Sequence, residues 1–289
     1  MHRGTHSFGR AGRSATVAAL LLVALTGCST AAGSGGDAPV AAESADAPKV
    51  QSVSPASGSL RGGTLVTIRG TGLSAVRSLR IAGSTVAVQH SGSSTVTLRT
   101  PAVERFVPGA QTFTLDDSSG SALSRGTYTY RVVDGTDAQL QYMLKYWKHY
   151  NPAYEALDDN DCVDFTSQGL LLRGWKQQGE WTHAQDVLAS GAAWRSSTAF
   201  RDFMEQHPEL GTPLTDQQRD QVKLGDVVQF DWDRSGDRDH TGVVTRIVKQ
   251  DGKIRIYFAG HTNDSDYRSV DTAIKEDHPG GVAYYWSIK

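Results

Sequence analysis

The chain contains two cysteines, Cys28 and Cys162, and the second lies in the polar segment DNDCVDFTSQG, residues 159–169. A nucleophilic cysteine must be a thiolate, whereas a free thiol titrates near pH ~8.5. Asn160 and Asp161 are good N-cap residues, so we expect Cys162 in the first turn of a helix. The unpaired N–H groups and the dipole of a helix N-terminus favour negative charge on sulfur. Cys162 is therefore a candidate nucleophile.

A thiolate nucleophile needs a neighbouring base, and two histidines stand where a base is expected. His240 opens the strand-like run HTGVVTRIVKQ, and His261 ends the next one, KIRIYFAGH. Consecutive antiparallel strands bring their side chains within reach of one another. A histidine on one strand and a polar group on the next is the arrangement that orients a general base.

The elements that would position these residues follow from the apolar spacing of the second half of the chain. Thr136 or Asp137 is expected to cap a first helix, and a second helix is expected from near Cys162 to Gly174. In the first helix the repeat i, i+3, i+4, i+7 is formed by Leu140, Met143, Leu144 and Trp147. In the second, the shared face is formed by Phe165, Gly169 and Leu172.

A third helix is expected over residues 198–206, ended by Pro208. Three strand-like runs follow it, GDVVQFDW, HTGVVTRIVKQ and KIRIYFAGH, joined by Gly and Asp turns. Helices followed by strands predict an α+β domain with an antiparallel sheet over residues 136–289.

Residues 50–133 have a different pattern, in which short alternating apolar runs are separated by turn residues. Val66 and Ile68 alternate with polar residues, as do Val96 and Leu98, which predicts a small all-β sandwich. The pattern PxSG…GGTxVTIxGxGL resembles the IPT/TIG type of immunoglobulin-like domain. It is matched by Pro55, Ser57, Gly58, Gly62, Gly63, Thr64, Val66, Thr67, Ile68, Gly70, Gly72 and Leu73. Such domains act as spacers or binding modules, and the preferred interpretation here is a spacer.

The first 27 residues have the pattern of a secretory signal. Three arginines precede an apolar run from Ala15 to Leu25. The run ends in Leu25-Thr26-Gly27-Cys28, which resembles the lipobox of bacterial lipoproteins and implies lipidation of Cys28. An ordinary signal peptide cut at Ala31 or Ala32 is the alternative.

Residues 28–49 follow this leader and are rich in Ala, Gly, Ser and Pro, which predicts a flexible tether. Lipidation of Cys28 would leave Cys162 unpaired and would place the protein on the outer face of the bacterial membrane.

Composition fits a soluble globular protein with enough chain for two modest cores. The 289 residues are 38% hydrophobic and have a net charge of −2, so no excess of basic charge points to nucleic acid as a partner.

The segments DNDCVDFTSQ, LGDVVQFDW, DH-TGVV and GHTND resemble the bacterial putative amidase domain family, a branch of papain-like cell-wall hydrolases that includes the NlpC and CHAP types. The resemblance runs from about Leu140 to the C-terminus. It implies a papain-like cysteine hydrolase domain in which Cys162 is the nucleophile and His240 the base. His261 is preferred as the third member, and Asn263 is the alternative.

The resemblance implies hydrolysis of amide bonds without a metal or organic cofactor, with peptidoglycan peptides as the substrate. The alternative, from another class, is a cell-surface lipoprotein that binds wall peptides without cleaving them. A metal hydrolase using Asp239, His240 and His261 is less favoured, because their spacing matches no common ligand motif.

One further motif, DxDxSGD at residues 231–237, resembles the first half of a calcium-binding loop. Gly242 stands where the loop needs an acid at its twelfth position, and strands instead of helices are expected on both sides. A solvated acidic turn is the preferred interpretation, and no metal is assigned.

Overall fold

The computed structural model describes residues 47–157 and 160–289. The predicted signal peptide (1–27), the lipidation of Cys28 and most of the predicted tether (28–49) lie outside the described residues. Within the described ranges, no helix is long and apolar enough to cross a membrane.

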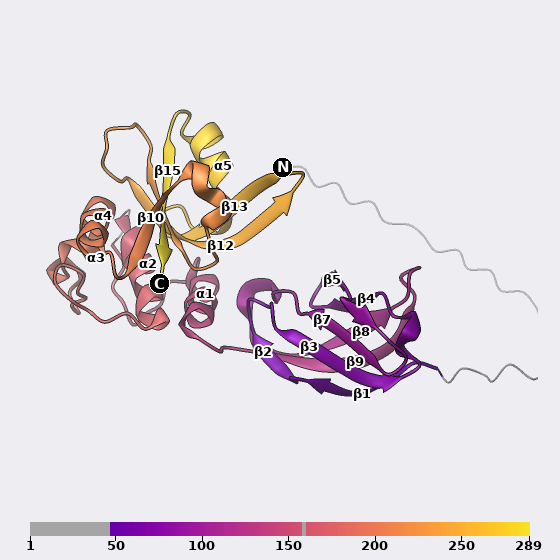
Figure 1. The fold of residues 1–289 in the computed structure, drawn as a ribbon. Coiled ribbons are helices and arrows are strands. Elements are labelled where there is room, and N and C mark those ends of the chain that lie inside the picture. The colour runs from indigo at the N-terminus through magenta and orange to yellow at the C-terminus, as the bar shows by residue number, and fades with distance from the viewer. Residues whose placement is uncertain (1–46, 158–159) are drawn as a thin grey trace, which may run out of the picture. The chain divides into compact units, whose positions relative to one another are not determined.

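The first region is all β, as its alternating pattern predicts (Figure 1). One sheet has the order β1-β3-β7-β6 and the other the order β2-β9-β8-β4-β5. The strands are β1 (Lys49–Ser54), β2 (Ser57–Ser59), β3 (Leu65–Thr71), β4 (Ser78–Ile81), β5 (Ser84–Ala87), β6 (His90–Ser91), β7 (Thr95–Arg99), β8 (Gly109–Asp116) and β9 (Ala122–Arg131).

The core of this sandwich is made of the residues whose alternation predicts burial. Val66 and Ile68 of β3 stand opposite Leu98 and Val96 of β7, and all four are at most 2% exposed. Pairing them across the strands places the apolar side chains on one face, where they pack against the second sheet. All pairs are antiparallel except β2 with β9, which is parallel.

The second region is α+β, as predicted, with one antiparallel sheet of order β10-β15-β11-β12-β13-β14. Its strands are β10 (Gly211–Thr215), β11 (Val227–Asp231), β12 (His240–Gln250), β13 (Lys253–Gly260), β14 (Ser265–Ser269) and β15 (Val282–Ile288). Its α-helices are α1 (Gly135–Tyr146), α2 (Cys162–Arg173), α3 (Ala192–Arg195), α4 (Ser197–Gln206) and α5 (Val270–Thr272).

The helices begin close to where the sequence predicts, with one cap assigned differently. Asp134, and not Thr136 or Asp137, is the N-cap of α1, because its side chain accepts the N–H of Asp137. Helix α2 ends at Gly174 in the left-handed conformation (φ 110°), as a glycine C-cap predicts. Leu172 was expected on the buried face of α2, but it is 44% exposed.

Asp137 is instead completely buried at the start of α1, where it meets the sandwich. Its carboxylate accepts hydrogen bonds from Ser59 Oγ (2.8 Å), Leu60 N (3.3 Å), Arg61 Nε (2.9 Å) and Val133 N (3.1 Å). Burial of a carboxylate is tolerated because four donors surround it.

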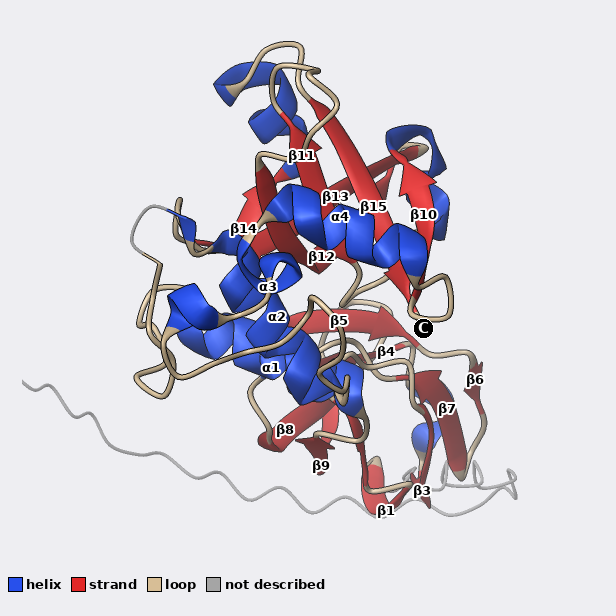
Figure 2. Ribbon diagram, turned by 90° about the vertical axis from the view of Figure 1, so that its left-hand side faces the viewer, coloured by secondary structure: helices blue, strands red, loops and turns tan. Residues whose placement is uncertain are grey.

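The six-stranded sheet is covered on both faces, so its central strand β11 is buried along its whole length. Val227 packs with residues of α2, α3 and α4, whereas Val228 and Phe230 pack with residues of β12, β13 and α5. Helix α2 lies beside α1 and α3 and against β12, and α4 crosses the same sheet (Figure 2). Side chains alternate between these two faces along each strand. We call the face under α2, α3 and α4 the helix face, and the other the far face.

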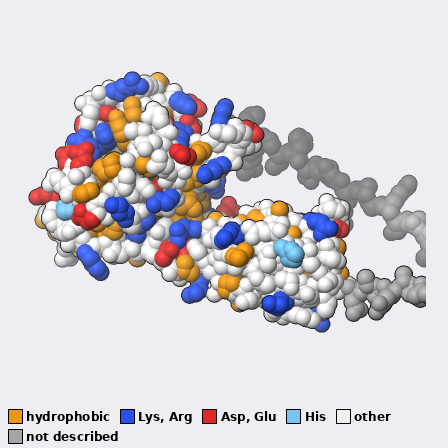
Figure 3. Space-filling model, in the orientation of Figure 1, with side chains coloured by type: hydrophobic (Ala, Val, Ile, Leu, Met, Phe, Trp, Pro, Cys, Tyr) orange, Lys and Arg blue, Asp and Glu red, His pale blue; other side chains and the backbone are white. Residues whose placement is uncertain are grey.

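The face of the molecule drawn in Figure 3 carries basic and acidic side chains side by side, with apolar side chains among them. Mixed charge of this kind is ordinary for a protein surface.

Candidate active site around Cys162

Cys162 is the first residue of α2, and its sulfur points into the protein. The residue is 1% exposed. Its backbone carbonyl accepts the hydroxyl of Thr166 (2.9 Å), which helps to hold the first turn. The sequence therefore predicts the position of Cys162 at a helix start correctly, but not its burial.

Three donors surround the sulfur. Ser197 Oγ lies 3.6 Å from Sγ, and the backbone N–H groups of Val163 and Thr241 also reach it. Burial raises the pKa of the Cys162 thiol, while these hydrogen bonds act in the opposite direction by favouring the thiolate. Burial has the larger effect on this pKa, so the Cys162 thiol is protonated near neutral pH in this structure.

A buried polar network continues from Cys162 across the helix face of the sheet. Thr241 Oγ1 donates to Ser197 Oγ (2.9 Å), and the Gln229 amide donates to Thr241 Oγ1 (3.1 Å) and to Ser197 O (2.7 Å). Trp286 Nε1 in turn donates to Gln229 Oε1 (2.9 Å). Sequence reasoning missed these four residues. The lone amide inside the apolar run VVQFDW was the signal for Gln229, because a buried polar side chain needs partners.

His261 lies just beyond β13 and is bound to the residue that precedes Cys162. Its Nδ1 is 2.5 Å from Asp161 Oδ2, its Nε2 is 2.9 Å from Tyr146 O, and both side chains are 1% exposed. Both ring nitrogens of His261 therefore have a hydrogen-bond partner.

The His261 ring is also stacked between those of Tyr150 and Phe165, with centroid distances of 3.6 Å on each side. Asp161 occupies the N-cap position of α2, yet its side chain makes no cap bond. It accepts instead from His261 and from Leu157 N (2.8 Å).

His240 lies on the far face of the sheet, away from the network around Cys162. In the register of β11 with β12, Gln229 pairs with Thr241 and Phe230 with His240. Since Gln229 and Thr241 share the helix face, Phe230 and His240 share the far face. The structure therefore brings Thr241, and not the His240 side chain, to the sulfur.

The His240 imidazole is buried, and its Nε2 has no hydrogen-bond partner. Burial, together with the nearby Arg268 and His278, lowers the pKa of His240 to about 3, so the ring is neutral at ordinary pH. Asn263, the alternative third member, is exposed in the turn after His261. The catalytic roles of Cys162, His240, His261 and Asn263 stay predictions.

A second buried carboxyl, Asp164, lies in the first turn of α2 and was not singled out from the sequence. It accepts from Trp194 Nε1 and from Gln168 Nε2, and Gln168 Oε1 accepts the hydroxyl of Tyr142 (2.5 Å). Burial and the neighbouring Asp161 raise the pKa of Asp164 to about 7. The segment Cys162-Val163-Asp164-Phe165 offered the signal, because Asp164 is the only acid in the helix expected after Cys162 and the six residues that follow it are uncharged.

A shared metal site of Asp239, His240 and His261 is not formed. His240 belongs to the far face, His261 is held by Asp161, and Asp239 lies among other aspartates in the loop after β11. That loop, residues 231–239, is the place in the described part of the chain where at least three metal-ligating side chains gather.

Two family models match this chain. The model described as "Putative amidase domain" matches residues 134–284, which is just over half of the chain, and the model described as "IPT/TIG domain" matches residues 48–130. The chain therefore belongs to the putative amidase domain family, with an IPT/TIG domain before the amidase domain. Membership of this family supports a role in amide hydrolysis.

A curated relative is the uncharacterized protein YhbB of Bacillus subtilis, 25% identical over 142 residues. The match covers 45% of this chain and 42% of YhbB, so the chain spans less than half of that relative.

Among solved structures, a similar one is the extracellular region of plexin A4. It is 18% identical over 29% of this chain and 10% of its own, with a TM-score of 0.26. Another is the glucan-utilization protein SGBP-B of Bacteroides ovatus, solved with a mixed-linkage heptasaccharide. It is 14% identical over 84% of this chain and 52% of its own, also with a TM-score of 0.26.

Proposed function

We propose that the second region is a cysteine hydrolase of amide bonds, with Cys162 as the nucleophile. One observation carries the proposal: within a chain segment that matches an amidase family, Cys162 begins a helix and its sulfur receives hydrogen bonds from Ser197 and from two backbone N–H groups. Such donors stabilise a thiolate and later the negative charge on an attacked carbonyl.

The reaction follows the chemistry of thiol acyl transfer. The Cys162 thiolate attacks the amide carbon, the C–N bond breaks as the leaving amine takes a proton, and water then hydrolyses the thioester. The proton passes from the thiol to a base and from the base to the amine.

We assign the base to His240, which has a neutral ring with a free Nε2, whereas both ring nitrogens of His261 are already bonded. His240 is the first residue of β12 and directly precedes Thr241, whose N–H reaches the sulfur. His240 lies on the far face and the Cys162 sulfur is buried. Catalysis therefore requires that the start of β12 rearrange so that the His240 imidazole reaches the helix face. The residues that bury the sulfur must also move to admit a substrate. His261 then acts as the orienting residue, and Asn263 is the alternative.

The substrate and location that we propose are those the leader sequence and the family suggest. Peptides of peptidoglycan are the substrate, in the manner of papain-like NlpC and CHAP hydrolases. A lipid on Cys28 holds the protein on the outer face of the membrane, and the IPT/TIG domain extends its reach.

The experiment uses residues 45–289, which form one compact unit, incubated with purified peptidoglycan and analysed by mass spectrometry. New amino and carboxyl termini that vanish with Cys162→Ala are the expected result. His240→Ala is expected to lower the rate by at least ~100-fold. Thr262→Ala, an exposed neighbour, is the matched control for Asn263→Ala. Products that persist with Cys162→Ala would refute the nucleophile, and full activity of His240→Ala would move the base to another residue.

Burial of the sulfur favours a second candidate, a lipoprotein that binds wall peptides without cleaving them. A thiol with 1% exposure and a raised pKa is typical of an inert packed cysteine. This candidate predicts that wild type and Cys162→Ala bind peptidoglycan equally and that neither releases products.

A further inference from the structure

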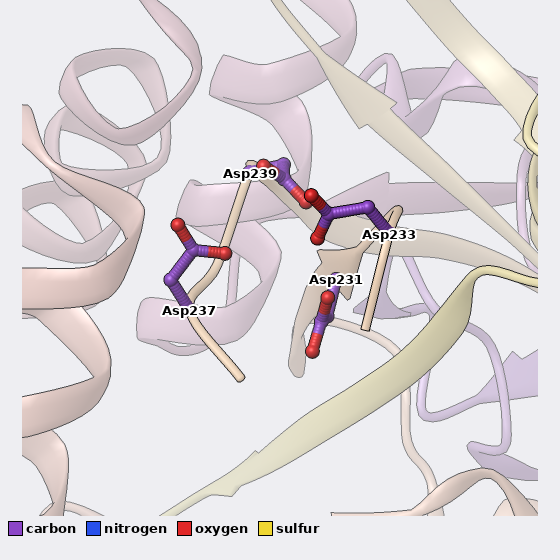
Figure 4. A group of neighbouring side chains, drawn as sticks. All are labelled: Asp231, Asp233, Asp237 and Asp239. Atoms are coloured by element: carbon purple, nitrogen blue, oxygen red, sulfur yellow. The ribbon is translucent and has the colours of Figure 1, made fainter. Parts of the chain in front are cut away.

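The loop that joins β11 to β12 gathers four aspartates around one point. One carboxylate oxygen of each of Asp231, Asp233, Asp237 and Asp239 lies within 4.8 Å of the others (Figure 4). Asp231 is the last residue of β11, and Asp239 directly precedes β12. Four carboxylates at this separation repel one another unless a cation lies between them.

Asp231 provides a second and independent observation. Its side chain is only 3% exposed, and its Oδ1 has no hydrogen-bond partner. The other oxygen, Oδ2, accepts the N–H of Gly236 (3.1 Å). Figure 4 shows one oxygen of this carboxylate turned toward the other three aspartates. A buried carboxylate oxygen without a partner is costly, which implies a ligand at that position.

Arg234 and Arg201 lie at the loop, but they donate to the carbonyl groups of Gly280 and Gly236 and form no ion pair with the four carboxylates. Among the described residues, Arg238 makes the ion pair with this group, at 3.9 Å from Asp231 Oδ2, and its guanidinium stacks on Tyr284 at 3.8 Å. Arg238 thus lies on the Oδ2 side and leaves Oδ1 free.

The other three aspartates are bonded to neutral donors. Asp233 Oδ1 accepts Ser235 N (2.9 Å), Asp237 Oδ1 accepts Ser235 Oγ (2.5 Å), and Asp239 Oδ2 accepts Trp232 N (2.6 Å). An excess of negative charge remains that a divalent cation would neutralise.

We propose that this loop binds a calcium ion through Asp231, Asp233, Asp237 and Asp239. Calcium accepts oxygens at about 2.3–2.6 Å, so two ligands on opposite sides of the ion are up to about 5 Å apart, in agreement with the 4.8 Å limit of this group. Magnesium, at about 2.1 Å, needs a tighter cluster.

A calcium loop between two helices has an acid at its twelfth position, and this loop has none there. The spacing of the four aspartates explains the difference. Asp231, Asp233 and Ser235 occupy its first, third and fifth positions, and Gly236 makes the sharp turn at the sixth with φ 93°. Its twelfth position, Gly242, lies inside β12. Asp239, at the ninth position, supplies the oxygen instead, because β12 begins directly after it. The sequence-based interpretation as a solvated turn did not anticipate the buried Asp231.

Calcium in this loop would tie the end of β11 to the start of β12, next to His240. The proposal does not depend on the proposed hydrolase activity, because its test measures binding and thermal stability.

The test compares the purified full-length chain with two variants after treatment with a chelator. Asp233→Asn and Asp237→Asn are combined in one variant, since both side chains are exposed and the fold should persist. Asp220→Asn, an exposed acid outside the loop, is the matched control. Calcium chloride is titrated in a calorimeter and in thermal melts, with sodium chloride added to keep ionic strength constant.

Wild type and Asp220→Asn are expected to bind calcium with a Kd at or below about 1 mM and to melt at a higher temperature when calcium is added. The double variant is expected to bind at least ~10-fold more weakly. Without calcium it should melt at or above the wild-type temperature, because the repulsion is reduced.

Three results would overturn the proposal. The first is no heat of binding and no change in melting temperature up to about 10 mM calcium, and the second is an equal response in the double variant. The third is an equal response to magnesium, which would exclude selectivity for calcium.

Discussion

Asp161 connects the start of α2 with His261 in the candidate site. It directly precedes Cys162, holds the imidazole of His261 and accepts the N–H of Leu157. A good N-cap residue is thus used for a tertiary contact, because the carboxylate is buried beside a histidine that lies 100 residues away, just beyond β13. Its pairing with His261 keeps β13 close to the start of α2.

Asp161→Asn is expected to destabilise the protein by about 1–3 kcal/mol, since a neutral amide replaces the carboxylate that accepts the buried hydrogen bonds of His261 and Leu157 N. The free energy of unfolding, measured with urea, tests this. Asp220→Asn, at an exposed and unpaired site, should change it by less than ~0.5 kcal/mol. A loss of under ~1 kcal/mol for Asp161→Asn would mean that the pair contributes little.

Asp164 is expected to make stability depend on pH. Its pKa is about 7 in the folded protein against an ordinary value of 3.8, so the folded state binds the proton more tightly. Its contribution is fully present below pH ~4 and is lost as pH rises through ~7. The loss between pH ~5 and pH ~8 is on the order of 2 kcal/mol.

Urea unfolding of wild type and Asp164→Asn at pH 5, 6, 7 and 8 measures this effect. The difference in unfolding free energy between the two should shift in favour of the variant as pH rises. A difference that is constant over this range would show that Asp164 does not titrate there.

Helices α1 and α2 approach each other so closely that glycine is needed at their contact. A Cβ on Gly135 would lie 1.9 Å from the carbonyl oxygen of Arg173, at the end of α2. A Cβ on Gly169 would lie 2.7 Å from Met143 Sδ, in a side chain that can move. The backbone contact at Gly135 is therefore the stricter constraint on how α2 carries Cys162.

Gly135→Ala is expected to destabilise the protein by about 1–3 kcal/mol, although alanine is the better helix former by about 1 kcal/mol. Lys145→Ala, at an exposed position of the same helix, is the control and should be nearly neutral. Unfolding by urea measures both. A gain in stability for Gly135→Ala would mean that the two helix ends separate without cost.

At the scale of the whole molecule, the IPT/TIG domain and the amidase domain are joined through Asp137. Its buried carboxylate is held by three residues of the sandwich, Ser59, Leu60 and Arg61, as well as by Val133. The first helix of the amidase domain is thereby attached to the preceding domain.

Asp137→Ala is expected to lower the free energy of unfolding by about 3–5 kcal/mol, because Arg61 and the buried Leu60 N–H lose their acceptor. It should also make protease cleavage after Arg131 or Arg61 faster in the native protein. Asp220→Ala is the matched control. An unchanged cleavage rate and stability would show that the two domains do not depend on this contact.

The helices and strands of this protein were predictable, because their sequence signals are local. The alternation around Val66 and Ile68, the apolar repeat of α1 and the glycine that ends α2 each act over a few residues, and each predicts its element correctly. The order of domains also followed, since the family motifs are read from nearby residues.

The surroundings of Cys162 could not be predicted in this way, because they depend on how the strands pair. Two strands that are consecutive in sequence can present His240 and His261 on the same face or on opposite faces, and a shift of one residue in register decides between them. The register that pairs Gln229 with Thr241 brings Ser197 and Thr241 to the sulfur and leaves His240 on the far face. The burial of Asp231 and the pairing of Asp161 with His261 arise in the same way, from contacts between segments far apart in the chain, which no local pattern records.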